Sequence, residues 1–482
     1  MKILIAASEA FPFCKTGGLG DVVGALSQMF SRLGDNEVVL FLPKYRNMGG
    51  GAFSLRAISG KFLIPMENKI ETASMSHVQW GKVAVYFIEN SKYFDRPGMY
   101  RTKYGDYKDN DERFIFFSRA VLEGAKFIGF KPDIIHCHDW QTALLPAYLN
   151  TLYRIDSFFV KTVSVFTINN IAYQGIFAKK SFLKAGFDWN DFTQDKFEFY
   201  GGMNFMKAGI VFTDRITTVS PSYSKEIQSY GEFGKGLEGV LKHRSKKLSG
   251  ILNGIDDEIW NPADDMFIKR NYDKKTFAKG KSNCKMALLK ECDIEEDKDI
   301  LLAGVVSRLD EQKGLDILCD VIPELTDKMQ FIILGAGEEK IANKLKKLAK
   351  TYPKRVFFKS GFNEALAHKI YAASDIFIMP SRFEPCGLSQ MIAMLYGSLP
   401  VATKTGGLKD TVFYTGEPKD SNGFLMEAAN KKSLRSALGK ALALFKRKLL
   451  WNTMIRNAMN GDYLWDASAE KYLEIFKSIR KR

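Results

Sequence analysis

The chain of 482 residues is longer than one hydrophobic core usually supports, and its 46% hydrophobic and 26% charged residues are ordinary for a globular protein, so we expect two large domains. A formal net charge of +15 at pH 7 favours an anionic partner, but no zinc finger or basic-leucine zipper is present, so we expect a small phosphate-bearing substrate rather than nucleic acid. No stretch approaches the roughly 18 apolar residues of a membrane span, and the six cysteines include no CxxC pair, which together predict a cytoplasmic protein with reduced thiols and no membrane partner.

A glycine-rich loop follows the first predicted strand. The apolar run 3–7 predicts that strand, and the sequence KTGGLGD at 15–21 leads from it into a predicted helix over 22–33. Gly17 and Gly18 let the backbone approach a ligand, and the unpaired N–H groups of a helix N-terminus favour an anion. A lone glycine-rich turn is a weak signal, and by itself this loop favours an ordinary tight turn.

Further apolar runs continue this pattern through the first half of the chain. They predict strands at 38–42, 83–88, 134–135, 163–166 and 216–219. Because the runs alternate with amphipathic stretches, we expect a parallel α/β sheet. His136, Cys137, His138 and Asp139 follow the third run and invite a zinc interpretation. Neighbours in an extended segment point to opposite sides, however, and no second ligand pair follows, so we predict no metal site there.

A change in composition near the middle of the chain divides it. We predict a first domain at 1–254, a linker rich in Gly, Pro, Asn and Asp at 255–265, a second domain at 266–455, and a helical tail at 456–482 that packs back on the first domain. Strands of the second domain are predicted at 300–306, 331–334, 356–358, 376–379 and 401–402. The expected architecture is therefore α/β, with two facing Rossmann-like domains and a deep cleft between them.

Two cations follow the first predicted strand of the second domain. Arg308 and Lys313 stand between that strand and an amphipathic stretch, so both can point beyond the strand end. A guanidinium and an ammonium in this position can hold a diphosphate, the first through bidentate bonds and the second as a point charge. Taken alone, an ordinary pair of surface cations explains them equally well.

Glu384 and a second glycine-rich loop complete the predicted site. Glu384 precedes Pro385, and Gly387 opens the next predicted helix, so the carboxylate can either bind sugar hydroxyls or complement a helix dipole. The sequence KTGGLKD at 404–410 repeats the first loop and follows another predicted strand. This repetition favours two phosphate-binding loops over two ordinary turns. The DxD-like triplets 109–111 and 297–299 lie in hydrophilic stretches, and we interpret both as solvated charges rather than metal ligands.

Eight motifs together resemble one family. They are KTGGLGD, HCHDWQTALLP, FTINNIAYQGIF, ITTVSPSYSKEI, LNGID, VSRLDEQKGLD, SRFEPCGLSQ and KTGGLKDTV. In order and spacing they resemble the bacterial glycogen synthases and plant starch synthases over nearly the whole chain. The resemblance implies a GT-B fold and a retaining glucosyltransferase that moves glucose from ADP-glucose to the non-reducing end of an α-1,4-glucan such as glycogen.

The resemblance also implies residue roles, beginning with the donor. Residues implied to contact the donor phosphates and sugar are Lys15, Gly17, Gly18, Arg308, Lys313, Thr405, Gly406 and Gly407. Glu384, supported by Gly387 and Leu388, is implied to hold the glucose hydroxyls and to stabilise the transition state. Phe362 occupies a position where the family stacks an aromatic ring on adenine. No metal and no cofactor is implied.

The acceptor side shows one departure from the family pattern. Residues implied to line it are Glu9, Asp21, Asp139 and Trp140. The family frame TxHNxxYQG reads TINNIAYQG at 167–175, so Asn169 stands where a His beside the reacting sugar is expected. The implied catalytic set is Glu384, Lys15, Asp139, Lys313 and Asn169.

Two alternatives remain open on the sequence. Asn169 motivates a catalytically silent glucan- or nucleotide-binding protein, although the retained cations and Glu384 argue against it. A glucan phosphorylase shares the two-domain plan but needs bound pyridoxal phosphate, which an absorption spectrum reveals.

Overall fold

The computed structural model describes residues 1–46, 48, 53–67, 69–229 and 231–480, which form two compact units. Unit 1 contains Met1–Val219, Ser224–Ile251 and Trp465–Arg482, and unit 2 contains Ser220–Tyr223 and Leu252–Leu464. No helix in the described ranges is both long and apolar enough to cross a membrane.

The segment that we predicted as a linker, 255–265, belongs to unit 2 by its contacts. Asp265 Oδ2 lies 2.8 Å from His368 Nδ1 and accepts a hydrogen bond from Tyr396 Oη (2.6 Å). Helix α16 (Lys448–Met459), which overlaps the start of the predicted tail, also belongs to unit 2, and the chain returns to unit 1 with α17 (Trp465–Arg480). Composition cannot place such boundaries, because turn residues also occur where tertiary contacts fix the chain.

The sheet of unit 1, within the described residues, has nine strands in the order β14-β13-β9-β8-β1-β2-β5-β4-β3. Their bounds are β1 (Lys2–Ala6), β2 (Glu37–Pro43), β3 (Arg56–Met66), β4 (Lys69–Trp80), β5 (Val83–Glu89), β8 (Ile134–His138), β9 (Val163–Ile168), β13 (Arg215–Thr218) and β14 (Leu248–Gly250). The seven strands from β14 to β5 pair in parallel, and continuous apolar runs predicted all of them except β14.

The two outer strands of this sheet correct the expectation of a purely parallel arrangement. Strands β3 and β4 pair antiparallel with each other, and β4 pairs antiparallel with β5. Much of β3 is exposed, with buried residues alternating only near its end. A strand that buries one face contains no continuous apolar run, so the pattern that revealed the parallel strands could not reveal this hairpin.

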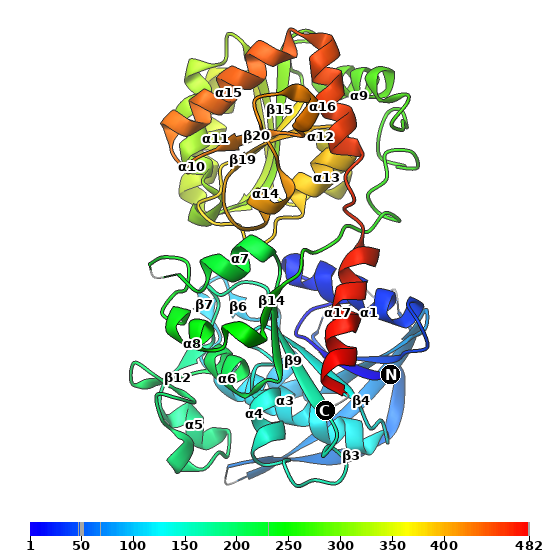
Figure 1. Cartoon of the computed structure of the whole chain (residues 1–482), viewed down its shortest axis with the longest axis vertical. Helices are drawn as coiled ribbons and strands as arrows, with labels where there is room; N and C mark the ends of the chain where they lie inside the picture. The colour runs from blue at the N-terminus through cyan, green and yellow to red at the C-terminus, as the bar shows by residue number, and fades with distance from the viewer. Residues whose placement is uncertain (47, 49–52, 68, 230, 481–482) are drawn as a thin grey trace. The chain divides into compact units, whose positions relative to one another are not determined.

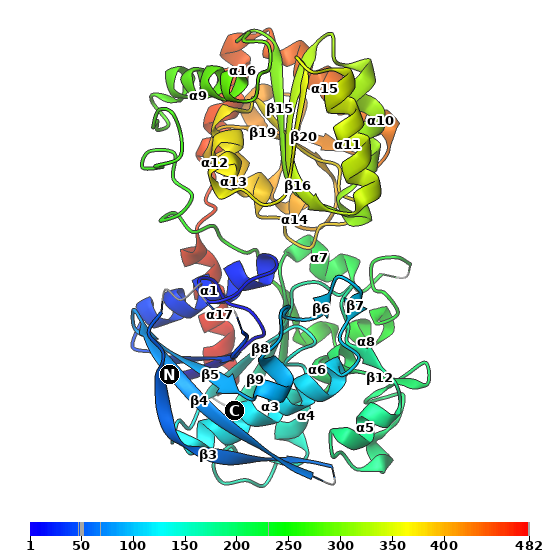
Figure 2. The same ribbon diagram turned by 180° about the vertical axis from the view of Figure 1, so that it is seen from behind.

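Helices cover both faces of the unit 1 sheet (Figures 1 and 2). On one face, α1 (Gly18–Arg32) lies beside α17. Trp465, Tyr472 and Phe476 of α17 are buried in a hydrophobic cluster with residues of α1 and the central strands. On the other face lie α3 (Asn110–Phe127), α4 (Leu144–Asn150) and α6 (Phe205–Phe212). The last helix of the chain thus completes the core of the first unit.

Unit 2 contains a sheet of six described strands, all parallel, in the order β17-β16-β15-β18-β19-β20. Their bounds are β15 (Leu301–Leu309), β16 (Met329–Gly337), β17 (Val356–Ser360), β18 (Ile376–Met379), β19 (Leu399–Thr403) and β20 (Phe424–Met426). The helices are α9 (Phe277–Glu291), α10 (Leu315–Val321), α11 (Glu339–Thr351), α12 (Glu364–Ala373), α13 (Ser389–Leu395), α14 (Gly406–Thr411) and α15 (Lys431–Phe445). Helices α10, α11 and α15 lie on one side of the sheet and α9, α12 and α13 on the other (Figures 1 and 2). The predicted α/β class is confirmed in both units.

Candidate active site

Most of the predicted site residues of each unit lie at three neighbouring strand ends, whereas Phe362 follows β17 at the edge of the unit 2 sheet. In unit 1, the first glycine-rich loop follows β1, the HCHDW segment lies at the end of β8, and Asn169 follows β9; the sheet places these strands in the order β9-β8-β1. In unit 2, the loop with Lys313 follows β15, the loop with Glu384 follows β18, and the second glycine-rich loop follows β19; these strands are also adjacent. Ligands of doubly wound sheets bind at such carboxyl ends.

The first glycine-rich loop leaves open space at the start of α1. Gly17 is the N-cap of α1 and Gly18 its first residue. A Cβ atom built on either would meet no other atom within 4 Å, so packing within the described protein does not require these glycines. The open space would allow a ligand to approach the backbone, which is the role that we predicted for this loop. Lys15 and Asp21 flank the loop, and their side chains form an ion pair (Nζ to Oδ1, 2.7 Å).

Glu9 binds the backbone of this loop through its carboxylate. Its carboxylate is buried and accepts hydrogen bonds from Thr16 N (2.5 Å), Thr16 Oγ1 (2.8 Å), Gly17 N (3.3 Å) and Tyr100 Oη (2.6 Å). Several donors on one carboxylate fix both the side chain and the backbone that it binds. These contacts make Glu9 a support of the glycine-rich loop, and its place on the acceptor side stays a prediction. Sequence reasoning missed this because Tyr100 is 91 residues away.

The two histidines at the end of β8 are buried and neutral. Burial lowers the pKa of His138 to about 3 and the pKa of His136 well below its usual value. The two rings lie on the same side of the strand, 4.2 Å apart between centroids, and His136 Nε2 lies 2.7 Å from Thr167 Oγ1. Cys137 is buried, and burial raises its pKa. Among the described residues, no three His, Cys, Asp or Glu side chains gather where a metal ion could be held.

Asp139 is a buried carboxyl group at a strained turn. Its φ of +56° lies in the left-handed region, and its Oδ1 accepts a hydrogen bond from Asn169 N (2.8 Å). Burial raises the pKa of Asp139 to about 7, although backbone hydrogen bonds from Asn169 and Asn170 oppose the shift. The side chain of Asn169 lies beside His138, with Nδ2 3.5 Å from Nδ1. Asp139 and Asn169, predicted separately, therefore form one constellation.

Trp140 packs in the core instead of facing solvent. Its ring lies 4.9 Å from that of Phe114 and 5.5 Å from that of Phe177, and a Cβ atom on Gly175 would come within 2.5 Å of it. The residue is 9% exposed. Trp140 thus supports the Asp139 turn through packing, and its place in the lining of the acceptor site stays a prediction.

The raised pKa of Asp139 predicts a pH-dependent contribution to stability. Because the folded pKa is above the ordinary value of 3.8, the folded state holds the proton more tightly, and this contribution is lost as pH rises towards about 7. Asn does not titrate, so Asp139→Asn should lack this loss. From pH 5 to pH 8 the free energy of unfolding of the variant should rise relative to that of wild type by on the order of 3 kcal/mol. Urea unfolding at both pH values measures the difference, with exposed Asp327→Asn as the control. If the free energy of unfolding of wild type and Asp139→Asn changed equally with pH, the raised pKa of Asp139 would be contradicted.

Lys313 and Glu384 form a closely held ion pair in unit 2. Lys313 Nζ lies 2.6 Å from Glu384 Oε2, and the side chains are 18% and 6% exposed. Ser381 Oγ also donates to Glu384 Oε2 (3.1 Å). From the sequence we predicted Lys313 and Glu384 as separate ligand contacts, and we predicted no role for Ser381. Ser381 lies three residues before Glu384 and just after a strand, and this position was the only signal of its role. The pair places a positive and a negative group side by side at the carboxyl end of the unit 2 sheet.

Arg308 lies near the end of β15, and Phe362 lies two residues after the end of β17. Arg308 is 48% exposed, and its Nη1 lies 2.9 Å from Asp310 Oδ2. Phe362 is 82% exposed beside the N-cap of α12, so a ring face is available for stacking. Gly387 has φ +73°, and α13 begins at Ser389 with Leu388 as its N-cap, two residues after the predicted start.

The second glycine-rich loop packs directly against the Glu384 segment. Gly406 has φ +44°, and a Cβ atom there would lie 1.9 Å from Glu384 O; one on Gly407 would lie 2.1 Å from Cys386 O. Gly407 N donates to the Glu384 and Pro385 carbonyl oxygens (3.1 and 3.2 Å). Thr405, the N-cap of α14, is buried. These glycines permit a close approach between the two backbone segments, whereas the space beside Gly17 and Gly18 of the first loop is open.

The DxD-like triplet at 109–111 is not a solvated run. Asp109 forms a bidentate pair with Arg96 (2.7 and 2.6 Å), and Asp111 binds Lys184 (2.7 Å) and Ser181 (2.6 Å). Both acids are structural ion-pair partners, which the hydrophilic sequence pattern could not distinguish from free charges.

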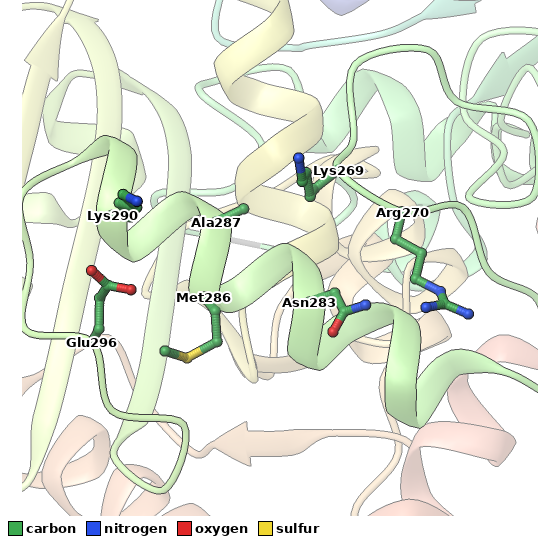
Figure 3. Close-up of a pocket in the computed structure, with 7 residues that line it drawn as sticks. All are labelled: Lys269, Arg270, Asn283, Met286, Ala287, Lys290 and Glu296. Atoms are coloured by element: carbon green, nitrogen blue, oxygen red, sulfur yellow. The ribbon is translucent and has the colours of Figure 1, made fainter.

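A hollow on the surface of unit 2 contains none of the predicted site residues. It has a volume of about 570 Å³ and lies beside α9, lined by Lys269, Arg270, Asn283, Met286, Ala287, Lys290 and Glu296 (Figure 3). Its three cationic side chains point in different directions rather than towards one point (Figure 3). The hollow therefore does not offer a formed anion site.

Comparison with known proteins gives consistent matches over the whole chain. Residues 2–243 match the family model of the starch synthase catalytic domain, and residues 299–443 match that of glycosyl transferases group 1. A glycogen synthase of Elusimicrobium minutum is 48% identical over 99% of both chains, and one of Geotalea daltonii is 44% identical over 99% of both. The catalytic domain of starch synthase IV from Arabidopsis thaliana, solved with ADP and acarbose bound, is 36% identical with a TM-score of 0.91, covering 100% of this chain and 99% of that one.

Proposed function

The chain belongs to the glycogen and starch synthase family and is a glucosyltransferase of glycogen synthesis, and from this premise we propose that it uses ADP-glucose to extend the non-reducing end of an α-1,4-glucan. The observation that carries the proposal is the Lys313–Glu384 pair at the carboxyl end of the unit 2 sheet. It offers a cation for the diphosphate and a carboxylate for the glucose hydroxyls within 2.6 Å of each other. The ADP bound to the starch synthase IV structure supports an adenine nucleotide donor.

The proposed reaction leaves negative charge on the departing diphosphate. The bond between glucose C1 and the diphosphate oxygen breaks, the acceptor hydroxyl oxygen bonds to C1, and its proton passes to the leaving diphosphate. Arg308 and Lys313 stabilise this charge, and Phe362 stacks on the adenine ring. An ammonium has three N–H donors, so Lys313 keeps its bond to Glu384 while it binds a phosphate oxygen. The protein thus contributes charge stabilisation and orientation.

We also propose that residues of unit 1 take part in binding the substrates. Lys15, with the open backbone at Gly17 and Gly18, contributes to donor binding, and Asp139 accepts a hydrogen bond from the acceptor glucan. Asn169 orients the donor glucose and, through its backbone N–H, holds the Asp139 carboxyl group. Asp21 keeps Lys15 beside the loop before the donor binds.

Transfer of labelled glucose tests the proposal. The purified protein is incubated with glycogen and either labelled ADP-glucose or labelled UDP-glucose, and polymer-bound label is measured. We expect incorporation from ADP-glucose at a clearly higher kcat/KM than from UDP-glucose. Preferential use of UDP-glucose would contradict the proposed donor, and the absence of polymer-bound label from both would contradict the transferase activity. A pyridoxal phosphate band in the absorption spectrum of the purified protein would instead identify a phosphorylase.

Asn169 provides a prediction about rate. We expect Asn169→His to raise kcat by several-fold, below about tenfold, with ADP affinity nearly unchanged, because an imidazole keeps a hydrogen-bonding group and can add positive charge near the leaving diphosphate. The neighbouring His138 has a pKa of about 3 and is neutral, so the new ring meets no cation. Steady-state rates at saturating ADP-glucose measure the change, with Asn343→His on exposed α11 as the control. A slower Asn169→His variant would show that the pocket is built around an amide.

A further inference from the structure

We infer that Arg382 is a positioning residue that sets the place of Lys313 relative to Glu384 by joining the two loops that carry them. The inference rests on the proposed reaction at this pair and concerns Arg382, which lies two residues before Glu384 in the chain. The loop 310–314 follows β15 and the loop 380–384 follows β18, and the two strands are neighbours in the sheet. Adjacent strands bring the loops near each other, but they do not fix two side chains to within a hydrogen-bond distance.

The guanidinium of Arg382 makes three hydrogen bonds to the opposite loop and helix. Nη1 and Nη2 donate to Asp316 Oδ1 and Oδ2 (2.8 and 2.7 Å), and Nη1 also donates to the Glu311 carbonyl oxygen (2.7 Å). Asp316 lies in the first turn of α10, directly after the Lys313 loop. The hydrogen bonds from Arg382 are the main cause that lowers the pKa of Asp316, so the carboxylate is held in its charged form.

Backbone contacts lie on both sides of this ion pair. Arg382 N donates to the Gln312 carbonyl oxygen (2.8 Å), and Gln312 Nε2 donates to the Phe383 carbonyl oxygen (3.2 Å). Gly314 has φ +64°, and a Cβ atom there would lie 2.1 Å from Pro380 O. The residues on both sides of Lys313 therefore contact the segment 380–383 directly before Glu384, and the ammonium lies 2.6 Å from the carboxylate.

A guanidinium is required because two of its bonds form a planar fork. A lysine at 382 could reach one oxygen of Asp316 but could not bind both oxygens and the Glu311 carbonyl in fixed geometry. Arg382 is 33% exposed and Asp316 38% exposed, so the pair adds modestly to global stability. Its effect is expected in geometry, where a displacement of about 1 Å in a reacting group costs up to about 100-fold in rate.

The test compares Arg382 variants alone and together with Lys313→Ala. We expect Arg382→Ala to lower kcat about tenfold while the dissociation constant of ADP changes by less than about threefold, and Arg382→Lys to recover only part of the rate. Arg435→Ala, which breaks another part-exposed arginine–carboxylate pair in unit 2, with Glu324, serves as the matched control and should keep the wild-type rate. Thermal unfolding of each variant confirms that the compared proteins are folded.

The combined variant separates positioning from a merely structural role. If Arg382 acts through Lys313, adding Arg382→Ala to Lys313→Ala should lower the rate by less than about twofold more. A full tenfold further loss in the combined variant, or an Arg382→Ala rate equal to wild type, overturns the inference while the proposed function stands. A normal rate in Lys313→Ala alone overturns the proposed role of Lys313 and, with it, this inference.

Discussion

Lys313→Ala is expected to lower kcat/KM by about 100-fold or more, because one well-placed charge on a leaving group is worth roughly 3 kcal/mol in the transition state. The ammonium is 18% exposed and lies 2.6 Å from Glu384, so it is held in place before the donor binds. Its proposed partner, the diphosphate oxygen, gains charge only as the bond to glucose breaks. The loss should therefore appear mainly in kcat, which initial rates at saturating and limiting ADP-glucose separate from KM.

Folding must be measured beside this rate, because the substitution leaves a buried carboxylate without its cation. Glu384 keeps the hydrogen bond from Ser381 in the variant. We expect a stability cost on the order of 1–3 kcal/mol, from the unpaired group, which still leaves a folded protein. Lys346→Ala, on an exposed face of α11, is the control and should change neither quantity. Near-normal turnover in folded Lys313→Ala would show that other residues hold the diphosphate.

Glu384→Gln is expected to lower kcat by about 100-fold with a smaller change in donor KM, since the carboxylate both binds sugar hydroxyls and holds Lys313 in place. Glutamine has nearly the same shape and can still accept a hydrogen bond from Ser381 Oγ, so the variant removes charge and leaves packing intact. Steady-state kinetics with ADP-glucose and glycogen measure the change. Glu339→Gln, at an exposed position of α11, is the matched control.

The double variant with Lys313→Ala shows whether the two residues act as a pair. Their joint effect should be smaller than the product of the single effects, because each side chain depends on the other for its position. Multiplicative effects would instead indicate that Glu384 and Lys313 contact the donor independently. A Glu384→Gln variant with the wild-type rate would remove Glu384 from the transition state altogether.

The sequence by itself determined the two-part α/β architecture. Continuous apolar runs such as 300–306 can be buried on both faces only inside a parallel sheet, and their alternation with amphipathic stretches predicts the covering helices. The hairpin of β3 and β4 could not be found in this way, because only part of each strand is buried. Contacts rather than composition place the segment around Asp265 in unit 2.

The sequence also determined which loops carry the candidate chemistry, because residue type and position after a strand are local properties. Only the tertiary structure decided which side chains meet. Lys313 and Glu384 are 71 residues apart and meet because β15 and β18 are neighbours in the sheet; Asp139 meets the Asn169 N–H because β8 and β9 are neighbours. The order of strands in a sheet is set by the packing of the whole chain, and no local pattern in the sequence encodes it.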